Sequence, residues 1–304
     1  MQKNNSFFVI VVAIVVLAVA GMFAFKKFRM PPAPAAQSTP VTTEQPVTLV
    51  PFVARTTQPF DEYTKYFTKK SYRVTGAGPE FFAPEQNVHY DLPYYWFQPA
   101  GAPYPPGLKF PLVLILHGGH GNAYAGKYLI QQDMQVKYPA FIIAPVLPQT
   151  WLWSNAGQVQ GHPEIKLPPR LAQGLPGTVR LIKSLLAEHP IDPKRIYVIG
   201  CSEGGMGAFG AVRHYPDIFA AAMPISGVWN ANDAPKMTGV PMWVMQGGAD
   251  TVIPADVPRM VTSIAKKNGG DVAYTELAEM GHNCPSSFLY GEPTWKWLFS
   301  HAKK

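Results

Sequence analysis

The sequence predicts an α/β fold in which helices cover both faces of a mostly parallel central sheet, preceded by an N-terminal transmembrane helix. Two near-continuous apolar runs of strand length, Phe110–His117 and Ala140–Pro145, are typical of strands that are buried on both faces. Beyond them, strand patterns alternate with stretches of helical spacing up to the end of the chain. Such alternation indicates parallel strands joined by crossover helices.

Each element is expected from its own local pattern. The segment Gly177–His189 carries aliphatic side chains at helical spacing, at Val179, Ile182 and Leu186 among others. Short apolar runs bounded by glycine, proline or polar residues predict the strands. In chain order we expect strands at Tyr90–Gln98, Phe110–His117 and Ala140–Pro145, a helix at Gly177–His189, a strand at Ile196–Ile199, a helix at Glu203–His214, strands at Ala220–Ile225 and Val240–Met245, a helix at Asp256–Asn268, a strand at Val272–Leu277 and a helix at Thr294–Ala302.

Three segments of different composition divide the chain at 1–29, 30–52 and 53–304. The first contains an uncharged apolar run, Phe7–Phe25, that is long enough to span a bilayer at ~1.5 Å per residue. A cleavable signal peptide with a site at Ala18–Ala20 is the alternative, but the apolar run continues past that site. We therefore expect a membrane anchor at 1–29. The Pro-, Ala- and Thr-rich residues 30–52 predict a linker, and 53–304 a single folded domain.

The side of the membrane is indicated by two conflicting signals. The cluster Lys26, Lys27 and Arg29 follows the apolar run, which under the positive-inside rule favours a cytoplasmic C-terminal domain. An N-terminal signal-anchor with an exported domain is the commoner arrangement for such chains, and the cysteines discussed below agree with it. We expect the folded domain on the extracytoplasmic side, with this conflict left open.

The positive charge does not indicate a nucleic-acid surface. The formal net charge is +7, but Lys3, Lys26, Lys27 and Arg29 contribute four of these charges before residue 31, and the rest of the chain carries only +3. No run of Lys and Arg in that remainder is longer than a pair such as Lys69–Lys70. We therefore expect no nucleic-acid partner.

A single serine stands where a strand pattern changes into a helix pattern. The run Gly200-Cys-Ser-Glu-Gly204 follows the apolar residues Ile196–Ile199 and has the form G-x-S-x-G of a nucleophile elbow. This turn is so sharp that its flanking positions leave no room for a Cβ, which explains the glycines. Ser202 is therefore the predicted nucleophile. Cys201 is not, because the central position of the elbow belongs to Ser202.

Nucleophiles on this turn need a base and an acid, which follow in the order Ser, acid, His on loops after later strands. Of the histidines after Ser202, His214 ends the elbow helix and His301 lies in the last helix, which leaves His282 in the loop after the last strand. Asp250 directly follows the strand Val240–Met245 and its glycines, and is the predicted acid. The other aspartates between them read as loop or helix-cap residues, namely Asp217, Asp233, Asp256 and Asp271.

An oxyanion hole requires two backbone N–H groups aimed at the charge that develops on the substrate. The residue after the nucleophile, Glu203, is predicted to supply one of them. The second is expected from the loop His117–Gly121, whose glycines let the backbone approach a substrate. Gly119 is the predicted donor, with His120 as the alternative.

Several of these motifs together resemble those of a known family, the α/β-hydrolase esterases that are often labelled predicted peptidases. That group is similar to feruloyl esterases and polyhydroxybutyrate depolymerases. The resemblance covers about residues 108 to 300 and leaves the N-terminal third without support. It rests on Gly-Cys-Ser-Glu-Gly-Gly at 200–205, Gly-Gly-Ala-Asp-Thr-Val-Ile-Pro at 247–254, Gly-His-Asn at 281–283 and Trp-Lys-Trp-Leu-Phe at 295–299.

The resemblance implies an α/β-hydrolase fold and hydrolysis of a small-molecule or polymer-linked carboxylic ester. It places a triad on Ser202, Asp250 and His282, which would act through an acyl-enzyme. No cofactor is expected. No metal is expected either, because the sequence lacks H-E-x-x-H and its Cys and His spacing suits no zinc site.

The chain has two cysteines, and both flank the predicted chemistry. Cys201 precedes the nucleophile, and Cys284 lies two residues after the predicted base. The feruloyl esterases and tannases that the chain resembles have a similar pair, with the second cysteine directly after the histidine. Here Asn283 is interposed. A disulfide between Cys201 and Cys284 is therefore one hypothesis, and two free buried thiols are the other.

Three tryptophans on loops at the expected edge of the site are candidate substrate-binding residues: Trp151, Trp153 and Trp229. Two glycine motifs suggest a nucleotide-binding protein as an alternative function. The run Gly121–Lys127 resembles a P-loop, but Tyr128 replaces its Ser or Thr, and Gly205–Gly210 fits G-x-G-x-x-G only inside the elbow helix. A hydrolase fold that binds without catalysis is a third possibility, which the complete set of Ser, Asp and His disfavours.

Overall fold

The computed structural model describes residues 64–76, 88–119, 125–148, 152–163, 165, 174–284 and 289–304. All of them belong to one compact unit, residues 33–304. The predicted anchor at 1–29, with its apolar run Phe7–Phe25, and the predicted linker at 30–52 lie outside the described residues. No helix in the described part of the chain combines the length and apolar character that a membrane span requires.

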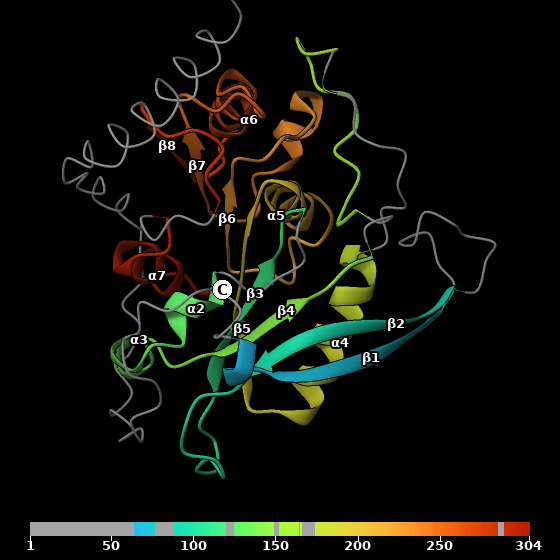
Figure 1. Ribbon diagram of the computed structural model, residues 1–304, viewed down its shortest axis with the longest axis vertical. Helices are drawn as coiled ribbons and strands as arrows, with labels where there is room; N and C mark the ends of the chain where they lie inside the picture. Colours follow the sequence, from blue (N-terminus) through green and yellow to red (C-terminus); the bar gives the residue numbers. More distant parts are fainter. Residues whose placement is uncertain are drawn as a thin grey trace, which may run out of the picture. The chain divides into compact units, whose positions relative to one another are not determined.

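The described residues form an eight-stranded sheet with the order β1-β2-β4-β3-β5-β6-β7-β8 (Figure 1). Strand β2 runs antiparallel to both β1 and β4, whereas β4, β3, β5, β6, β7 and β8 are all parallel to one another. The strands are β1 (Thr68–Gly76), β2 (Val88–Phe97), β3 (Phe110–Leu116), β4 (Phe141–Pro145), β5 (Ile191–Cys201), β6 (Ala221–Ile225), β7 (Met242–Gly247) and β8 (Val272–Leu277). The predicted parallel sheet is therefore confirmed, with an antiparallel hairpin added at one edge.

Helices lie on both sides of this sheet, as Figure 1 shows for α4 and α5 on one side and α2, α3 and α7 on the other. An ion pair between Lys137 and Glu292, 2.9 Å long, joins α3 to α7. The helices are α2 (Gly126–Leu129), α3 (Gln132–Lys137), α4 (Gly174–Glu188), α5 (Glu203–His214), the 3-10 helix η3 (Ala231–Lys236), α6 (Asp256–Lys267) and α7 (Glu292–Phe299).

The central strands are buried on both faces, because each face is covered by helices. On β3, Leu112, Leu114 and Leu116 belong to the large hydrophobic core that also contains residues of α4, α5 and α6. Alternate side chains on neighbouring strands point to the opposite face. There the ring of Tyr197 packs on Phe299 of α7, with ring centres 5.2 Å apart. This two-sided burial explains why β3, β4 and β6 read as continuous apolar runs.

The main element that the sequence pattern did not predict is the edge strand β1. Its residues Lys69, Lys70 and Arg73 are exposed, and Val74 is its fully buried hydrophobic residue. Because most side chains of β1 are exposed, its residues do not form an apolar run. Lysines at a sheet edge are expected because they discourage pairing with other chains. The short helices α2 and α3 and the 3-10 helix η3 were also not expected, and helix α4 begins three residues earlier than predicted, at Gly174.

Candidate active site

Ser202 occupies a strained turn between β5 and α5. Its backbone has φ 60° and ψ −119°, a region that non-glycine residues rarely adopt. The strain is enforced by close packing on both sides of the serine. A Cβ at Gly200 would overlap the carbonyl of Gly204, and a Cβ at Gly204 would overlap the carbonyl of Leu116. The turn therefore holds the Ser202 side chain at the C-terminal end of β5.

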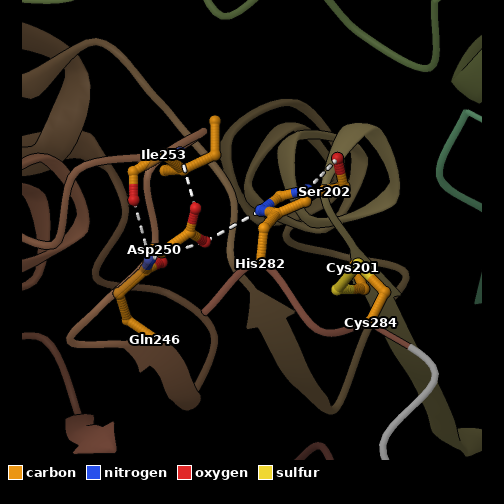
Figure 2. Close-up of a disulfide and its surroundings, with 7 residues drawn as sticks. All are labelled: Cys201, Ser202, Gln246, Asp250, Ile253, His282 and Cys284. Atoms are coloured by element: carbon orange, nitrogen blue, oxygen red, sulfur yellow. Dashed lines mark hydrogen bonds and ion pairs between the residues drawn. A yellow bond between two sulfur atoms is a disulfide. The ribbon is translucent and has the colours of Figure 1, made fainter. Parts of the chain in front are cut away.

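Three predicted site residues meet at this end of the sheet (Figure 2). The His282 imidazole lies between the other two: its Nε2 is 3.0 Å from Ser202 Oγ, and its Nδ1 is 2.8 Å from Asp250 Oδ2. Asp250 follows β7 and His282 follows β8. Because carboxyl ends of parallel strands share one edge of a sheet, residues more than thirty positions apart come into hydrogen-bond contact. With Nδ1 donating to the carboxylate, Nε2 is left to accept the serine proton.

Asp250 is buried and fully hydrogen-bonded, with its side chain 0 % exposed. Its Oδ1 accepts the backbone N–H groups of Val252 and Ile253, each at 2.8 Å. Its Oδ2, the atom that faces His282, also accepts Nε2 of Gln246 at 3.1 Å. A buried carboxylate needs such donors to offset its lost hydration. Sequence reasoning missed Gln246, although a polar residue at the end of an apolar strand was a usable signal.

The loop after β3 is fixed by the side chain of His117. The ring Nδ1 donates to the carbonyl of Gly118 at 2.6 Å, and Nε2 accepts the N–H of Leu147 at 3.0 Å. These two partners require the neutral imidazole with its proton on Nδ1. Burial lowers the pKa of His117, partly opposed by the hydrogen bond to Gly118, and this favours the same neutral form.

The two glycines of this loop lie close to the elbow. A Cβ on Gly118 would come within 3.2 Å of the Cys201 carbonyl and 3.4 Å of Ser202 Cβ, whereas one on Gly119 would meet nothing within 4 Å. The Gly118 carbonyl points at the His117 ring, so in a trans peptide the N–H of Gly119 points the opposite way. This agrees with Gly119 as a donor, whose role stays a prediction, as does that of Glu203 at the start of α5. The alternative His120 lies outside the described residues.

A disulfide joins Cys201 to Cys284, with the two Cα atoms 5.6 Å apart (Figure 2). The residue interposed between His282 and Cys284 is accommodated by a tight turn, in which the N–H of Asn283 donates to the carbonyl of Gly281 at 2.8 Å. The disulfide connects the residue before the elbow serine to the loop that carries His282. It thus restricts the separation of these two side chains.

A comparison with protein families places the chain in one family. A family model described as Esterase PHB depolymerase matches residues 92–263, which is more than half of the chain. The chain belongs to this family. The family match begins in β2 and ends in α6, so it includes Ser202 and Asp250, whereas His282 lies beyond it.

The chain is similar to individual known proteins over shorter segments. It is 42% identical over 48 residues to poly(3-hydroxyalkanoate) depolymerase C from Paucimonas lemoignei, covering 16% of this chain and 12% of that protein. It is 30% identical over 118 residues to feruloyl esterase B from Thermothelomyces thermophilus, covering 39% of each protein. The chain therefore matches less than half the length of either curated relative.

Solved structures support the α/β-hydrolase fold over most of the family member. A thermostable esterase superposes with a TM-score of 0.62 and 27% identity, covering 79% of this chain and 64% of that one. A ferulic acid esterase superposes with a TM-score of 0.52 and 15% identity, covering 77% of this chain and 98% of that one. The predicted α/β-hydrolase fold is thus confirmed.

The expectation that tryptophans contact substrate is corrected by their burial. Trp153 is 0% exposed and Trp229 is 1% exposed, so neither indole offers a surface to a ligand. The Trp153 Nε1 instead donates to the carbonyl of His117 at 2.9 Å, and its ring packs edge-on against the imidazole. Trp153 therefore supports the loop after β3 from inside the core. Trp151 lies outside the described residues.

The alternative functions gain no support from the described residues. The run Gly205–Gly210 lies wholly inside α5, so it does not form the strand-to-helix loop of a dinucleotide site. Most of the P-loop-like segment, residues 121–124, is outside the described part of the chain. Within that part, no group of three or more His, Cys, Asp or Glu side chains could hold a metal ion.

The disulfide carries a testable expectation about stability. Titration of the unfolded, unreduced protein should find no reactive thiol, and reduction should expose two. The bridge closes a loop with a sequence separation of 83, so Cys284→Ser should lower the free energy of unfolding by up to about 4.5 kcal/mol. Two reactive thiols before reduction would contradict the bridge.

Two buried histidines predict a loss of stability in mild acid. Burial lowers the pKa values of His117 and His301 from 6.5, so the unfolded chain binds their protons at a higher pH than the folded chain does. The stabilisation is complete above pH 6.5 and declines below it, at most by about 1.4 kcal/mol per pH unit for each histidine. Urea unfolding at a series of pH values should show this decline, with a smaller slope for His301→Gln. An unfolding free energy that stays level from pH 7 to pH 5 would argue against it.

Proposed function

We propose that the protein is a serine hydrolase that cleaves carboxylic esters, with Ser202, His282 and Asp250 acting as a catalytic triad. One observation carries the proposal: a single imidazole bridges the serine hydroxyl at 3.0 Å and the buried carboxylate at 2.8 Å. This arrangement satisfies the geometric requirement for an activated nucleophile, in which a base contacts the nucleophile and is itself oriented by a third group.

Acylation starts when His282 Nε2 accepts the proton of Ser202 as its Oγ attacks the ester carbonyl carbon. The carbonyl oxygen becomes negatively charged in the tetrahedral intermediate, and the N–H groups of Gly119 and Glu203 stabilise that charge. Asp250 holds the imidazole in the required tautomer and stabilises the imidazolium. The bond to the leaving oxygen then breaks, and His282 donates its proton to this oxygen, which releases the alcohol.

Deacylation repeats these steps with water. His282 removes a proton from water, whose oxygen attacks the acyl carbon bound to Ser202. The second tetrahedral intermediate breaks down as the imidazolium returns its proton to Ser202 Oγ. The products are the free acid and the original enzyme, and no external oxidant, metal or cofactor takes part in the balance.

The substrate class is proposed from the relatives. One is named as a poly(3-hydroxyalkanoate) depolymerase and others as feruloyl esterases. Both names indicate an ester of a hydroxylated carboxylic acid, and the depolymerase name adds a polymer. A small-molecule or polymer-linked ester of this kind is therefore the proposed substrate.

A substrate panel tests the function. The full chain in detergent is assayed with p-nitrophenyl esters of increasing acyl length, a methyl hydroxycinnamate and an oligomer of 3-hydroxybutyrate. We expect turnover of at least one member, with complete inhibition by a fluorophosphonate that reacts with activated serines. A folded protein that turns over no member and does not react with the fluorophosphonate would refute the proposal.

We also propose that residues 7–25 anchor the protein in a membrane, that 30–52 tether it, and that the domain 53–304 lies on the extracytoplasmic side. The apolar run and the disulfide support this, since disulfides persist in oxidising compartments. Protease protection in sealed vesicles of known orientation tests the side. Digestion of the domain only from the cytoplasmic face, or release of the protein by alkaline carbonate, would contradict the proposal.

A further inference from the structure

Gln246 lies at the end of β7 with no exposed surface, and its amide is directed at the acid of the proposed triad (Figure 2). We propose that Gln246 is a positioning residue that fixes the orientation of the Asp250 carboxylate toward His282. This inference rests on the proposed function, because it concerns how the same site is held in its working geometry.

The amide nitrogen of Gln246 connects the acid to its own loop. Nε2 lies 3.1 Å from Asp250 Oδ2, 2.9 Å from the carbonyl oxygen of Ile253 and 3.2 Å from the carbonyl oxygen of Gly247. All three partners are acceptors, so the nitrogen and not the oxygen of the amide must face them. One side chain thus links both ends of the turn 250–253 from inside the protein.

The two oxygens of Asp250 are held from different directions. Backbone N–H groups of Val252 and Ile253 hold Oδ1, while Oδ2 is shared between Gln246 and His282. Without Gln246, the imidazole would be the only partner of Oδ2 among the described contacts. The carboxylate could then turn about the two backbone hydrogen bonds that Oδ1 accepts. Oδ2 would move, and the imidazole bonded to it would move away from Ser202.

The unused half of the amide argues against a purely structural role. Oε1 of Gln246 is buried and has no hydrogen-bond partner among the described residues. A buried acceptor without a partner is destabilising, and an apolar side chain of the same length would avoid that cost. The polar side chain is therefore better explained by what its nitrogen does for Asp250 than by packing.

A matched pair of substitutions tests the proposal. Gln246→Met removes the donor at nearly constant shape. The control is Gln135→Met, because Gln135 is also buried, donates to a backbone carbonyl through Nε2 and has an unpartnered Oε1, but lies in α3 away from the site. kcat and KM of the full chain are measured across pH, with the active fraction determined by fluorophosphonate titration.

For Gln246→Met we expect kcat per active site to fall about tenfold or more, with KM little changed. The acidic limb of kcat/KM should also move to higher pH, because a carboxylate with one donor fewer stabilises the protonated imidazole more strongly. Gln135→Met should leave both quantities as in the wild type. Wild-type kcat and an unmoved limb in Gln246→Met would overturn the proposal, as would an equal effect of the control.

A second variant covers the case in which Gln246→Met fails to fold. Gln246→Glu keeps the shape, and its protonated form can still donate to Asp250 Oδ2. At higher pH the new glutamate loses this proton, and its carboxylate repels that of Asp250. Activity should therefore fall on the alkaline side, which gives a bell-shaped pH profile. A profile identical to that of the wild type would overturn the proposal.

One further readout separates this inference from the proposed function. If the wild type hydrolyses no ester, the function fails, but the position of His282 can still be followed by the NMR signals of its ring protons and nitrogens. Gln246→Met should shift the Nδ1–H signal and its titration, and Gln135→Met should not. Unchanged His282 signals in Gln246→Met would refute the positioning role on their own.

Discussion

Replacing Ser202 by alanine should lower kcat for ester hydrolysis by roughly 10⁴- to 10⁶-fold. Alanine removes the oxygen atom that would form the proposed acyl-enzyme, while the predicted oxyanion donors at Gly119 and Glu203 remain. The backbone at this position is already strained, with φ 60°, and alanine has the same Cβ as serine, so the fold should persist. Steady-state kinetics on the best substrate of the panel measures the loss.

The chain offers a matched control for this substitution. Ser226 is also a buried serine with positive φ, 44°, in the turn directly after β6, and its Oγ has no hydrogen-bond partner among the described residues. Ser226→Ala therefore makes the same chemical change beside the site and should leave kcat near the wild-type value. Retained hydrolysis in Ser202→Ala, or an equal loss in Ser226→Ala, would speak against Ser202 as the nucleophile.

The second large effect is expected for Asp250→Asn, which should lower kcat by roughly 10⁴-fold. The N–H groups of Val252 and Ile253 will hold the oxygen of the new amide. Its NH₂ group then takes the place of Oδ2 and faces Nδ1 of His282 as a donor. The imidazole must respond by carrying its proton on Nε2, the tautomer that cannot accept the serine proton.

Asp271→Asn is the control for the loss of one negative charge. Asp271 is exposed and lies just before β8, outside the set of residues that contact His282. We expect wild-type kcat/KM for this variant at every pH. A similar loss in both variants would mean that overall charge, and not the tautomer of His282, accounts for the effect of Asp250→Asn.

The sequence predicted the parts of the fold in which burial dictates residue type. Strands β3, β4 and β6 were recognisable because both of their faces are covered, so that nearly every side chain is apolar. Strand β1 was missed for the opposite reason. It lies at an edge of the sheet, and its exposed lysine, serine and arginine residues outnumber its buried ones. Nothing in such a pattern distinguishes an exposed strand from a loop.

The candidate site was predictable where topology orders its residues along the chain. Ser202, Asp250 and His282 each follow a strand of the parallel part of the sheet, and elimination among few candidates then sufficed. Gln246 was missed because its role depends on a side chain reaching the next loop. The expectation that Trp153 and Trp229 contact substrate was wrong because a position after a strand does not reveal the direction of the side chain, and both indoles are buried.

Mass spectrometry of the protein after reaction with a fluorophosphonate or with a slowly hydrolysed ester shows directly whether Ser202 is the nucleophile. We expect one adduct per chain, on the peptide that contains Ser202, and none in Ser202→Ala. The same adduct should form slowly or not at all in Asp250→Asn. An adduct on any other residue, or ester hydrolysis that proceeds while Ser202 stays unmodified, would show that Ser202 is not the nucleophile.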